Sequence, residues 1–429
     1  MPNRDIQVRK MVPKVYHAHI PKTAGTSLNA WLDDSVSADR AKPDGFDGEL
    51  VRWFKAYGVP GIRSEKTIFA SCWDIYDVLH GHNNMSNART DNSIVVTVMR
   101  DPLARSISLY YDLASLSEDK LKHMKGPVLS YRQDCLKMSF NDIRNKWSHS
   151  ILFQRQYLDY MCRFFMRNDF SFETPFKMSS EERFRSAAAI IERDVTAYGV
   201  TEQLGKTVHR FSQVLGLYPR KSLPRYNLGR PKTSEITSDD KLFISTLTVG
   251  DRMLWEHYTN KLGDMSVDYS VENFESAKLG EAIKAVRLME HREGVAYGIN
   301  AAFIGDGFWG RDSARGAECR RWSGPEDDSV LYLPWTQAAP VDVALHVSGW
   351  SSPDARSSFS VRGWSAPLKH SFSSGGEVAD IVRFRAIPRN GVLKLQFHSL
   401  ARTDEEVGNP VSDGRRKAFS LKSIVLHSS

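Results

Sequence analysis

The sequence has few cysteines and no long hydrophobic segment. Its 429 residues include four cysteines, Cys72, Cys135, Cys162 and Cys319, and none has the CxxC spacing of zinc and redox sites. Scattered cysteines in a chain of this length predict reduced residues in a cytosol. Residues 1–14 are polar and basic without the apolar centre of a secretory signal, and no run of about 18 apolar residues occurs. We therefore expect a disordered lead, no membrane span and a cytoplasmic, bacterial protein.

The chain also lacks internal repeats and a Walker A motif, G-x-x-x-x-G-K-[ST]. No aspartate suited to Mg²⁺ directly ends a predicted strand, since Asp101 follows Arg100. A nucleotide kinase is therefore disfavoured, and we expect any bound nucleotide to be handled without a metal. The net charge of +7 suits an anionic ligand, or is only a solvated surface, and is not diagnostic of nucleic acid.

What the chain does contain is an alternation of strand-like and helix-like segments up to about residue 270. Residues 15–20 and 197–201 predict short strands, and residues 94–99, a continuous β-branched run, predict a central parallel strand. Helices are expected at residues 103–111, 180–194, 204–215 and 239–258. This order predicts an α/β domain over residues 15–270, a P-loop-like three-layer sandwich with a parallel central sheet. Such sheets bind ligands at the carboxyl ends of their strands.

The pattern changes after residue 270. Residues 271–296 predict a linker with a helix at residues 277–291. Residues 297–429 contain short alternating segments, such as 341–347 and 393–397, which predict an antiparallel β-sandwich accessory domain. Five of the ten tryptophans lie in this part: Trp309, Trp322, Trp335, Trp350 and Trp364. We expect them mainly in the core, although exposed tryptophans can also stack on sugars.

A small-residue loop follows the first predicted strand and precedes Leu28, Trp31 and Leu32 at helical spacing. The loop after Pro21 consists of Lys22, Thr23, Ala24, Gly25, Thr26 and Ser27. A strand, a loop with one lysine and a helix N-terminus form a cradle for a phosphate group. The alternative is a tight turn with chance hydroxyls.

A second anion-binding candidate follows the central strand. Arg100 ends that strand, Asp101 and Pro102 suit the start of a helix, and Ser108 lies two helical turns further on. An arginine can bind a phosphate with two hydrogen bonds, and a serine hydroxyl can add another. The alternative is an arginine that satisfies the backbone at the strand end, with a solvated serine.

Together these stretches resemble the two cosubstrate signatures of the carbohydrate (Golgi-type, family 2) sulfotransferases. The matching segments are HIPKTAGTS at residues 19–27 and VMRDPLARSISLYY at residues 98–111, and YGVTEQ at residues 198–203 resembles a later core segment. The likeness spans about residues 15–260. It implies 3′-phosphoadenosine 5′-phosphosulfate (PAPS) as cosubstrate and adenosine 3′,5′-bisphosphate (PAP) as product. Residues 22–27 would hold the phosphosulfate, and Arg100 and Ser108 the 3′-phosphate.

Two further assignments depend on this resemblance. His80-Gly81-His82 is similar to an HGH segment of the heparan-sulfate 2-O-sulfotransferase branch, which implies His82, or else His80, as the catalytic base. Other branches use a glutamate, and a histidine pair is often structural. The basic loop at residues 220–233 resembles one that closes over the 3′-phosphate in related enzymes, or is a solvated linker. Its candidate ligands are Arg225, Arg230, Lys232 and Thr233.

The acceptor is expected near the cationic helical region at residues 112–195, whose charges suit an acidic acceptor or form a solvated face. These cations are Lys120, Lys122, Lys125, Arg132, Arg144, Lys146, Arg155 and Arg163. The C-terminal sandwich resembles a module of bacterial glycosyltransferases and related glycan-modifying enzymes, and could hold a glycan or a partner.

The predicted function is transfer of a sulfuryl group from PAPS to a hydroxyl of a glycan or glycoconjugate, with Lys22 stabilising the leaving phosphate. The alternatives are an inactive, glycan-binding protein of sulfotransferase fold, and a sulfotransferase for peptide tyrosine or lipid. The oligomeric state stays open.

Overall fold

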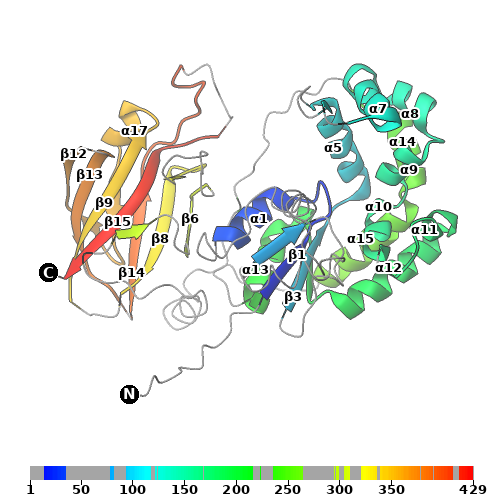
Figure 1. Cartoon of the computed structure of the whole chain (residues 1–429). Helices are drawn as coiled ribbons and strands as arrows, with labels where there is room; N and C mark the ends of the chain where they lie inside the picture. Colours follow the sequence, from blue (N-terminus) through cyan, green and yellow to red (C-terminus); the bar gives the residue numbers. More distant parts are fainter. Residues whose placement is uncertain are drawn as a thin grey trace, which may run out of the picture.

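The computed structural model describes residues 14–34, 78–81, 93–116, 121–122, 124–167, 169–215, 223, 235–263, 294, 296–298, 304–309, 320–335, 339–376, 378–389, 391–408 and 415–428. The first part of the chain combines helices with a parallel sheet, and the last part consists mainly of antiparallel strands (Figure 1). The α/β class and the C-terminal antiparallel sheets are therefore confirmed. The predicted linker helix at residues 277–291 lies outside the described residues.

The parallel sheet has four strands in the order β2-β1-β3-β4. Strand β1 (Lys14–Ala18) lies between β2 (Val78–Gly81) and β3 (Ser93–Met99), and β4 (Ala197–Val200) pairs with β3. All of these pairs are parallel. The carboxyl ends of all four strands therefore lie at one edge of the sheet.

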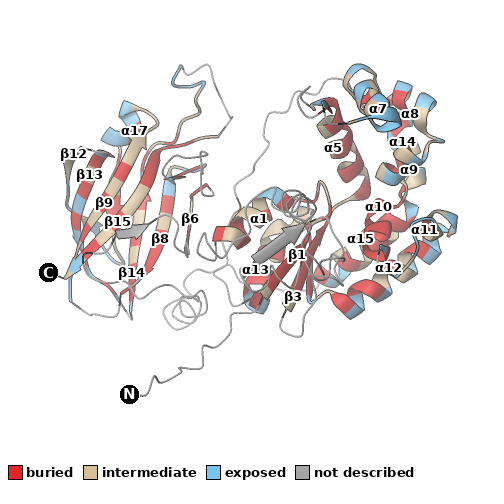
Figure 2. Cartoon of the chain, viewed as in Figure 1, coloured by how far each residue is buried: buried red, intermediate tan, exposed pale blue. Residues whose placement is uncertain are grey.

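Helices pack against both faces of this sheet. On β3, Val95 and Met99 belong to one buried cluster with α10, α12 and α15, whereas Val96 and Val98 belong to another with α1 and α13. The alternation follows from the two-residue period of a strand. The helices of this part are α1 (Gly25–Asp34), α5 (Pro102–Ala114), α7 (Gly126–Lys137), α8 (Phe140–Trp147), α9 (Ile151–Tyr157), α10 (Tyr160–Met166), α11 (Thr174–Lys177), α12 (Ser180–Asp194), α13 (Leu204–Leu215), α14 (Ser238–Leu247) and α15 (Val249–Gly263). Figure 2 shows buried residues along β1 and β3 and on helices α10 and α15.

The prediction of one continuous helix at residues 239–258 was wrong. The segment forms two helices, α14 and α15, separated at Thr248. The carbonyl of Leu247 accepts a hydrogen bond from the Asp159 amide, 2.9 Å between N and O, instead of continuing one helix. The break places Asp251 at the start of α10. Its carboxylate accepts the backbone amides of Met161 and Cys162 at 3.0 and 2.8 Å. A continuous hydrophobic period gave no sign of this break.

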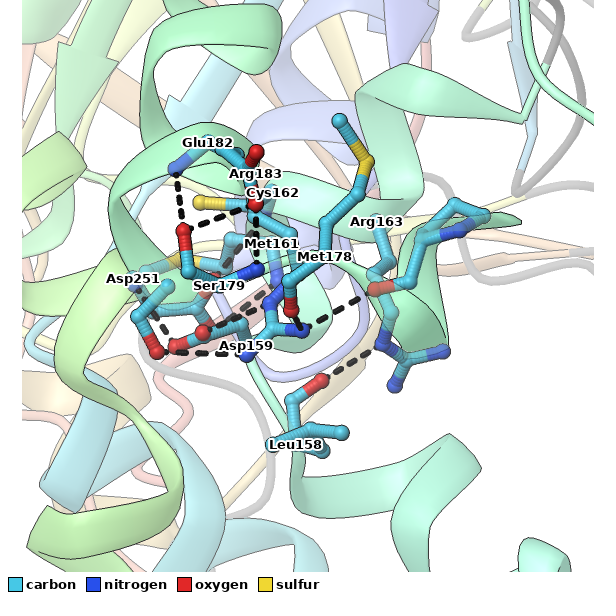
Figure 3. A network of polar contacts seen from close by, with 12 residues as sticks. Leu158, Asp159, Met161, Cys162, Arg163, Met178, Ser179, Glu182, Arg183 and Asp251 are labelled. Carbon is cyan, nitrogen blue, oxygen red and sulfur yellow. Dashed lines mark hydrogen bonds and ion pairs between the residues drawn. The ribbon is translucent and has the colours of Figure 1, made fainter. Parts of the chain in front are cut away.

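A buried polar network joins α10, α12 and α15 at that point (Figure 3). The Arg183 guanidinium donates to the Asp159 carboxylate at 2.9 Å, and the two side chains are 5% and 0% exposed. Burial and the neighbouring Asp159 raise the pKa of Asp251 to about 6. Because every one of these charges is paired or hydrogen-bonded, the network fixes how the three helices meet.

Gly250 of α15 lies close to two members of this network, and a larger residue there would not fit without a shift. A methyl group there would lie 2.6 Å from the Ser180 carbonyl oxygen and 2.9 Å from Asp159 Oδ2. We expect Gly250→Ala to lower the free energy of unfolding by about 1–3 kcal/mol, although alanine is the better helix former. Gly263→Ala is the control, because no atom lies within 4 Å of a methyl group at that position in the same helix. Urea unfolding of both variants checks this. Equal stability of the two would show that the network tolerates the extra methyl group.

The C-terminal part contains two antiparallel sheets, with strand orders β11-β10-β14-β8-β6 and β12-β13-β9-β15-β5, and β7 pairs with β15 at the side of the second. The strands are β5 (Ala296–Gly298), β6 (Ile304–Asp306), β7 (Arg321–Trp322), β8 (Asp328–Pro334), β9 (Val341–Trp350), β10 (Ser360–Arg362), β11 (Pro367–Leu368), β12 (His370–Gly375), β13 (Val378–Ala386), β14 (Val392–His398) and β15 (Phe419–Ser428), and a short helix α17 spans Pro353–Ser357. Leu331 and Leu395 of one sheet share a buried cluster with Leu345 and Val382 of the other. The sheets therefore form a β-sandwich, as the alternating sequence predicted.

The tryptophans of the sandwich mostly pack inside the protein. Trp309 and Trp335 are buried, and Trp350 packs against the sandwich core. The Trp364 indole donates to the Val392 carbonyl at 3.1 Å. Trp322 is partly exposed. The expected core role is thus confirmed for Trp309, Trp335 and Trp350.

The sandwich and helix α1 are joined by buried contacts. Arg321 donates both Nη atoms to the Asp34 carboxylate, at 2.6 and 2.8 Å, and the two side chains are 0% and 2% exposed. Tyr332 and Val392 of the sandwich share a buried cluster with Leu28 and Trp31 of α1. The end of α1 that lies away from the loop at residues 22–27 is therefore anchored on the sandwich.

Candidate anion-binding site

The two predicted anion-binding stretches lie at the same edge of the parallel sheet. The loop at residues 22–27 follows β1, and Arg100 follows β3, its immediate neighbour. Within the sheet, the Thr97 hydroxyl donates to the Ala18 carbonyl at 2.9 Å, and this hydrogen bond links the carboxyl ends of the two strands. The two stretches therefore follow adjacent strands that are hydrogen-bonded to each other.

The loop itself has an unusual backbone. Lys22 and Ala24 adopt positive φ angles of 72° and 62°, a left-handed conformation that costs a residue with a Cβ roughly 1–2 kcal/mol. Between them Thr23 is fully buried, and its hydroxyl donates to the Ile20 carbonyl at 2.8 Å. Left-handed residues in a tight turn bring backbone amides together in a concave anion-binding nest. Strain of this kind is typical of ligand-binding loops.

Helix α1 begins directly at this loop. Gly25 is its first residue, and the Leu28 amide donates to the Ala24 carbonyl at 3.2 Å. A methyl group at Gly25 would lie 1.7 Å from Nε2 of His19, so the His19 imidazole occupies the space that a side chain would need. The helix N-terminus adds a partial positive charge to the nest.

Arg100 connects the two stretches. Its guanidinium donates from Nη1 to the Lys22 carbonyl oxygen, with an N–O distance of 3.0 Å. Burial lowers the pKa of Arg100, while Glu202 and Asp101 partly offset this by favouring the charged form. Glu202 also accepts the Asp101 amide at 3.0 Å. The arginine predicted for the 3′-phosphate therefore also supports the loop predicted for the phosphosulfate.

A carboxylate that the sequence did not point out lies beside the loop. Asp112 of α5 forms an ion pair with Lys22, 2.6 Å between Oδ1 and Nζ, and the two side chains are 29% and 20% exposed. Ser108 lies four residues before Asp112, so both occupy the same face of α5. That face is directed to the loop. The helical spacing from Ser108 was the only signal in the sequence that could have found Asp112.

The predicted base and the predicted basic loop are not tested by these contacts. His80 lies in β2, and its backbone is in register with His17 of β1. His82, Arg225, Arg230, Lys232 and Thr233 lie outside the described residues. Their roles stay predictions.

Several cations of the helical region have structural partners. Arg163 is buried and donates to the carbonyls of Leu158 and Gln154, and burial lowers its pKa to about 10. Arg144 pairs with Asp240 at 3.2 Å. These two arginines are therefore engaged within the protein, and whether the region binds an acceptor stays a prediction. Lys120 lies outside the described residues.

No protein-family model matches the chain, and no curated protein matches it. Among solved structures, the chain is similar to the native structure of a family 35 carbohydrate-binding module from Clostridium thermocellum. The identity is 7%, the TM-score is 0.23, and the alignment covers 32% of this chain and 98% of the module. A TM-score of that size does not establish a shared fold.

Within the part of the chain that the structure describes, no helix is both long and apolar enough to cross a membrane. The described edge of the sheet brings together a loop with two left-handed residues, a helix N-terminus, one lysine and one arginine. Such a site can hold a ligand with two separate anionic groups.

Proposed function

We propose that this chain is a sulfotransferase that moves a sulfuryl group from PAPS to a hydroxyl of a glycan or glycoconjugate. The observation that carries the proposal is the hydrogen bond from Arg100 to the Lys22 carbonyl. It joins the two segments that resemble the 5′-phosphosulfate and 3′-phosphate signatures of carbohydrate sulfotransferases, and PAPS carries both anionic groups on one ribose. The parallel sheet with helices on both faces is consistent with the P-loop-like fold that we assign to the domain.

In the proposed reaction, an acceptor hydroxyl oxygen forms a bond to the sulfur of PAPS while the bond between sulfur and the 5′-phosphate oxygen breaks. The hydroxyl proton passes to a base, for which His82 is the first candidate and His80 the second. The electron pair of the broken bond stays on the phosphate oxygen of PAP. The Lys22 ammonium and the loop amides stabilise this growing charge.

The two anionic groups of PAPS match the two cationic parts of the site. The 5′ end of PAPS is an anion that suits the nest around Lys22, Thr23, Ala24 and Gly25, with Thr26 and Ser27 in the first turn of α1. The 3′-phosphate suits Arg100 and Ser108 one strand away. A glycan acceptor is favoured by the resemblance of the sandwich to modules of glycan-modifying enzymes.

The test is a transfer assay with PAPS labelled in its sulfate, against a panel of cell-envelope glycans and of lipid- and nucleotide-linked sugars. We expect labelled product from at least one glycan, with release of PAP. Binding of PAP without transfer to any glycan, tyrosine peptide or lipid would favour the inactive alternative. Absence of PAP binding at millimolar concentration would contradict the proposal.

The 3′-phosphate assignment predicts a selective effect of Ser108→Ala. Loss of one hydrogen bond to a charged group should weaken PAP binding by about tenfold or more. Binding of adenosine 5′-phosphate, which lacks the 3′-phosphate, should not change. Calorimetric titration of both nucleotides measures this, with Ser357→Ala in the short helix α17 of the sandwich as the control. Equal losses for the two nucleotides would place Ser108 elsewhere in the site.

A further inference from the structure

The contact between Lys22 and Asp112 has a consequence for the donor site. Asp112 is an anion located 2.6 Å from the ammonium group of the lysine that the proposed reaction needs. A negative charge at this distance opposes binding of a negatively charged donor. It also restrains a lysine side chain that has many rotamers. The two effects act in opposite directions on binding and on the chemical step.

We infer that Asp112 is the counter-ion and positioning residue of Lys22. It holds the ammonium over the loop before the donor binds, and gives it up to the donor on binding. This inference rests on the proposed function for the identity of the donor, but not for the existence of the anion site. Asp112 does not itself touch the transferred group and is not a catalytic residue.

The surroundings support this role. The loop backbone that carries Lys22 is left-handed, and its carbonyl accepts a hydrogen bond from Arg100, which restrains this part of the loop. The amide of Ser115 donates to the Asp112 carbonyl at the end of α5, which makes Asp112 part of an ordered helix. The ion pair therefore joins side chains from two ordered segments and restrains the flexible ammonium group between them.

A merely structural residue and a counter-ion predict different results for Asp112→Asn. If Asp112 only supported the fold, its loss would weaken anion binding. As the counter-ion, its loss should strengthen binding of PAP by about threefold to tenfold, because an opposing charge is removed. Turnover should fall by about tenfold, since the ammonium is no longer oriented for the transfer step. Affinity and turnover thus change in opposite directions.

The experiment measures the dissociation constants of PAP and, separately, of pyrophosphate by calorimetry, together with turnover of labelled PAPS, at one ionic strength. Asp112→Glu retains the carboxylate and should keep the affinity of the unmodified protein. Asp342→Asn removes a carboxylate from an arginine pair in the sandwich and should change nothing. Asp112→Ser repeats the loss of charge with a smaller side chain in case Asp112→Asn does not fold. In a Lys22→Ala background the fall in turnover caused by Asp112→Asn should disappear, because the carboxylate then has no ammonium group to orient.

Weaker or equal binding in Asp112→Asn, or unchanged turnover, overturns the inference. Tighter pyrophosphate binding in Asp112→Asn, with no PAP binding by any variant, supports the counter-ion and contradicts the proposed donor. No binding of either ligand to the unmodified protein overturns both.

Discussion

Replacing Lys22 with alanine should lower the rate of sulfuryl transfer by about 100-fold to 1,000-fold, the usual loss when one group that stabilises transition-state charge is removed. The charge develops on the phosphate oxygen that leaves the sulfur, and Lys22 is the lysine of the loop that would hold this oxygen. Its side chain is 20% exposed and paired with Asp112. The fold should therefore persist, and the loss should appear in turnover more than in the melting temperature.

The control for this variant is Lys206→Ala, which removes a surface lysine that donates to the Gly263 carbonyl at 3.2 Å. It should retain the turnover of the unmodified protein. Single-turnover assays with saturating labelled PAPS separate the chemical step from donor binding. Unchanged single-turnover rates in Lys22→Ala would show that another group carries the charge of the leaving phosphate.

The second large effect is expected where the sandwich meets α1. Arg321→Ala should lower the free energy of unfolding by about 3–5 kcal/mol, because it removes the guanidinium that donates two hydrogen bonds to the buried Asp34 carboxylate. Arg321 and Asp34 are 0% and 2% exposed, so the ion pair is shielded from water in the folded protein. Denaturant unfolding, followed by tryptophan fluorescence, measures the change.

Two variants make this test specific. Arg385→Ala breaks an ion pair of similar geometry, 2.8 Å from Asp342, but these side chains are 62% and 46% exposed. It should cost about 0–1 kcal/mol. The double variant Arg321→Met with Asp34→Leu replaces the buried pair by apolar side chains and should recover most of the loss. A small effect of Arg321→Ala would mean that solvent reaches Asp34 in solution.

Local sequence patterns predicted the elements that local forces determine. The β-branched run at residues 94–99 became the central strand β3, and the Ser179–Glu182 capping box begins α12 at the expected place. The boundary at Thr248 was missed because the hydrophobic period continues across it. What ends α14 is a hydrogen bond from Asp159, which lies far away in the sequence. Long-range contacts of this kind leave no periodic signal.

The site shows the same division. The loop around Lys22 and the strand end at Arg100 each have a local signature, and the parallel sheet brings them together as expected. Asp112 has no signature of its own, since its importance comes from the side chain that it contacts. The ion pair between Arg321 and Asp34 joins residues 287 positions apart. Neither segment contains a local sequence pattern that indicates this ion pair.

Helix α1 has a mechanical consequence for the protein. Its ten residues make a rod of about 15 Å. The strained loop with Lys22 precedes one end, and the other end is held on the sandwich by the ion pair between Asp34 and Arg321. A helix this short scarcely bends, so a movement that tilts the sandwich relative to the sheet would also displace the loop.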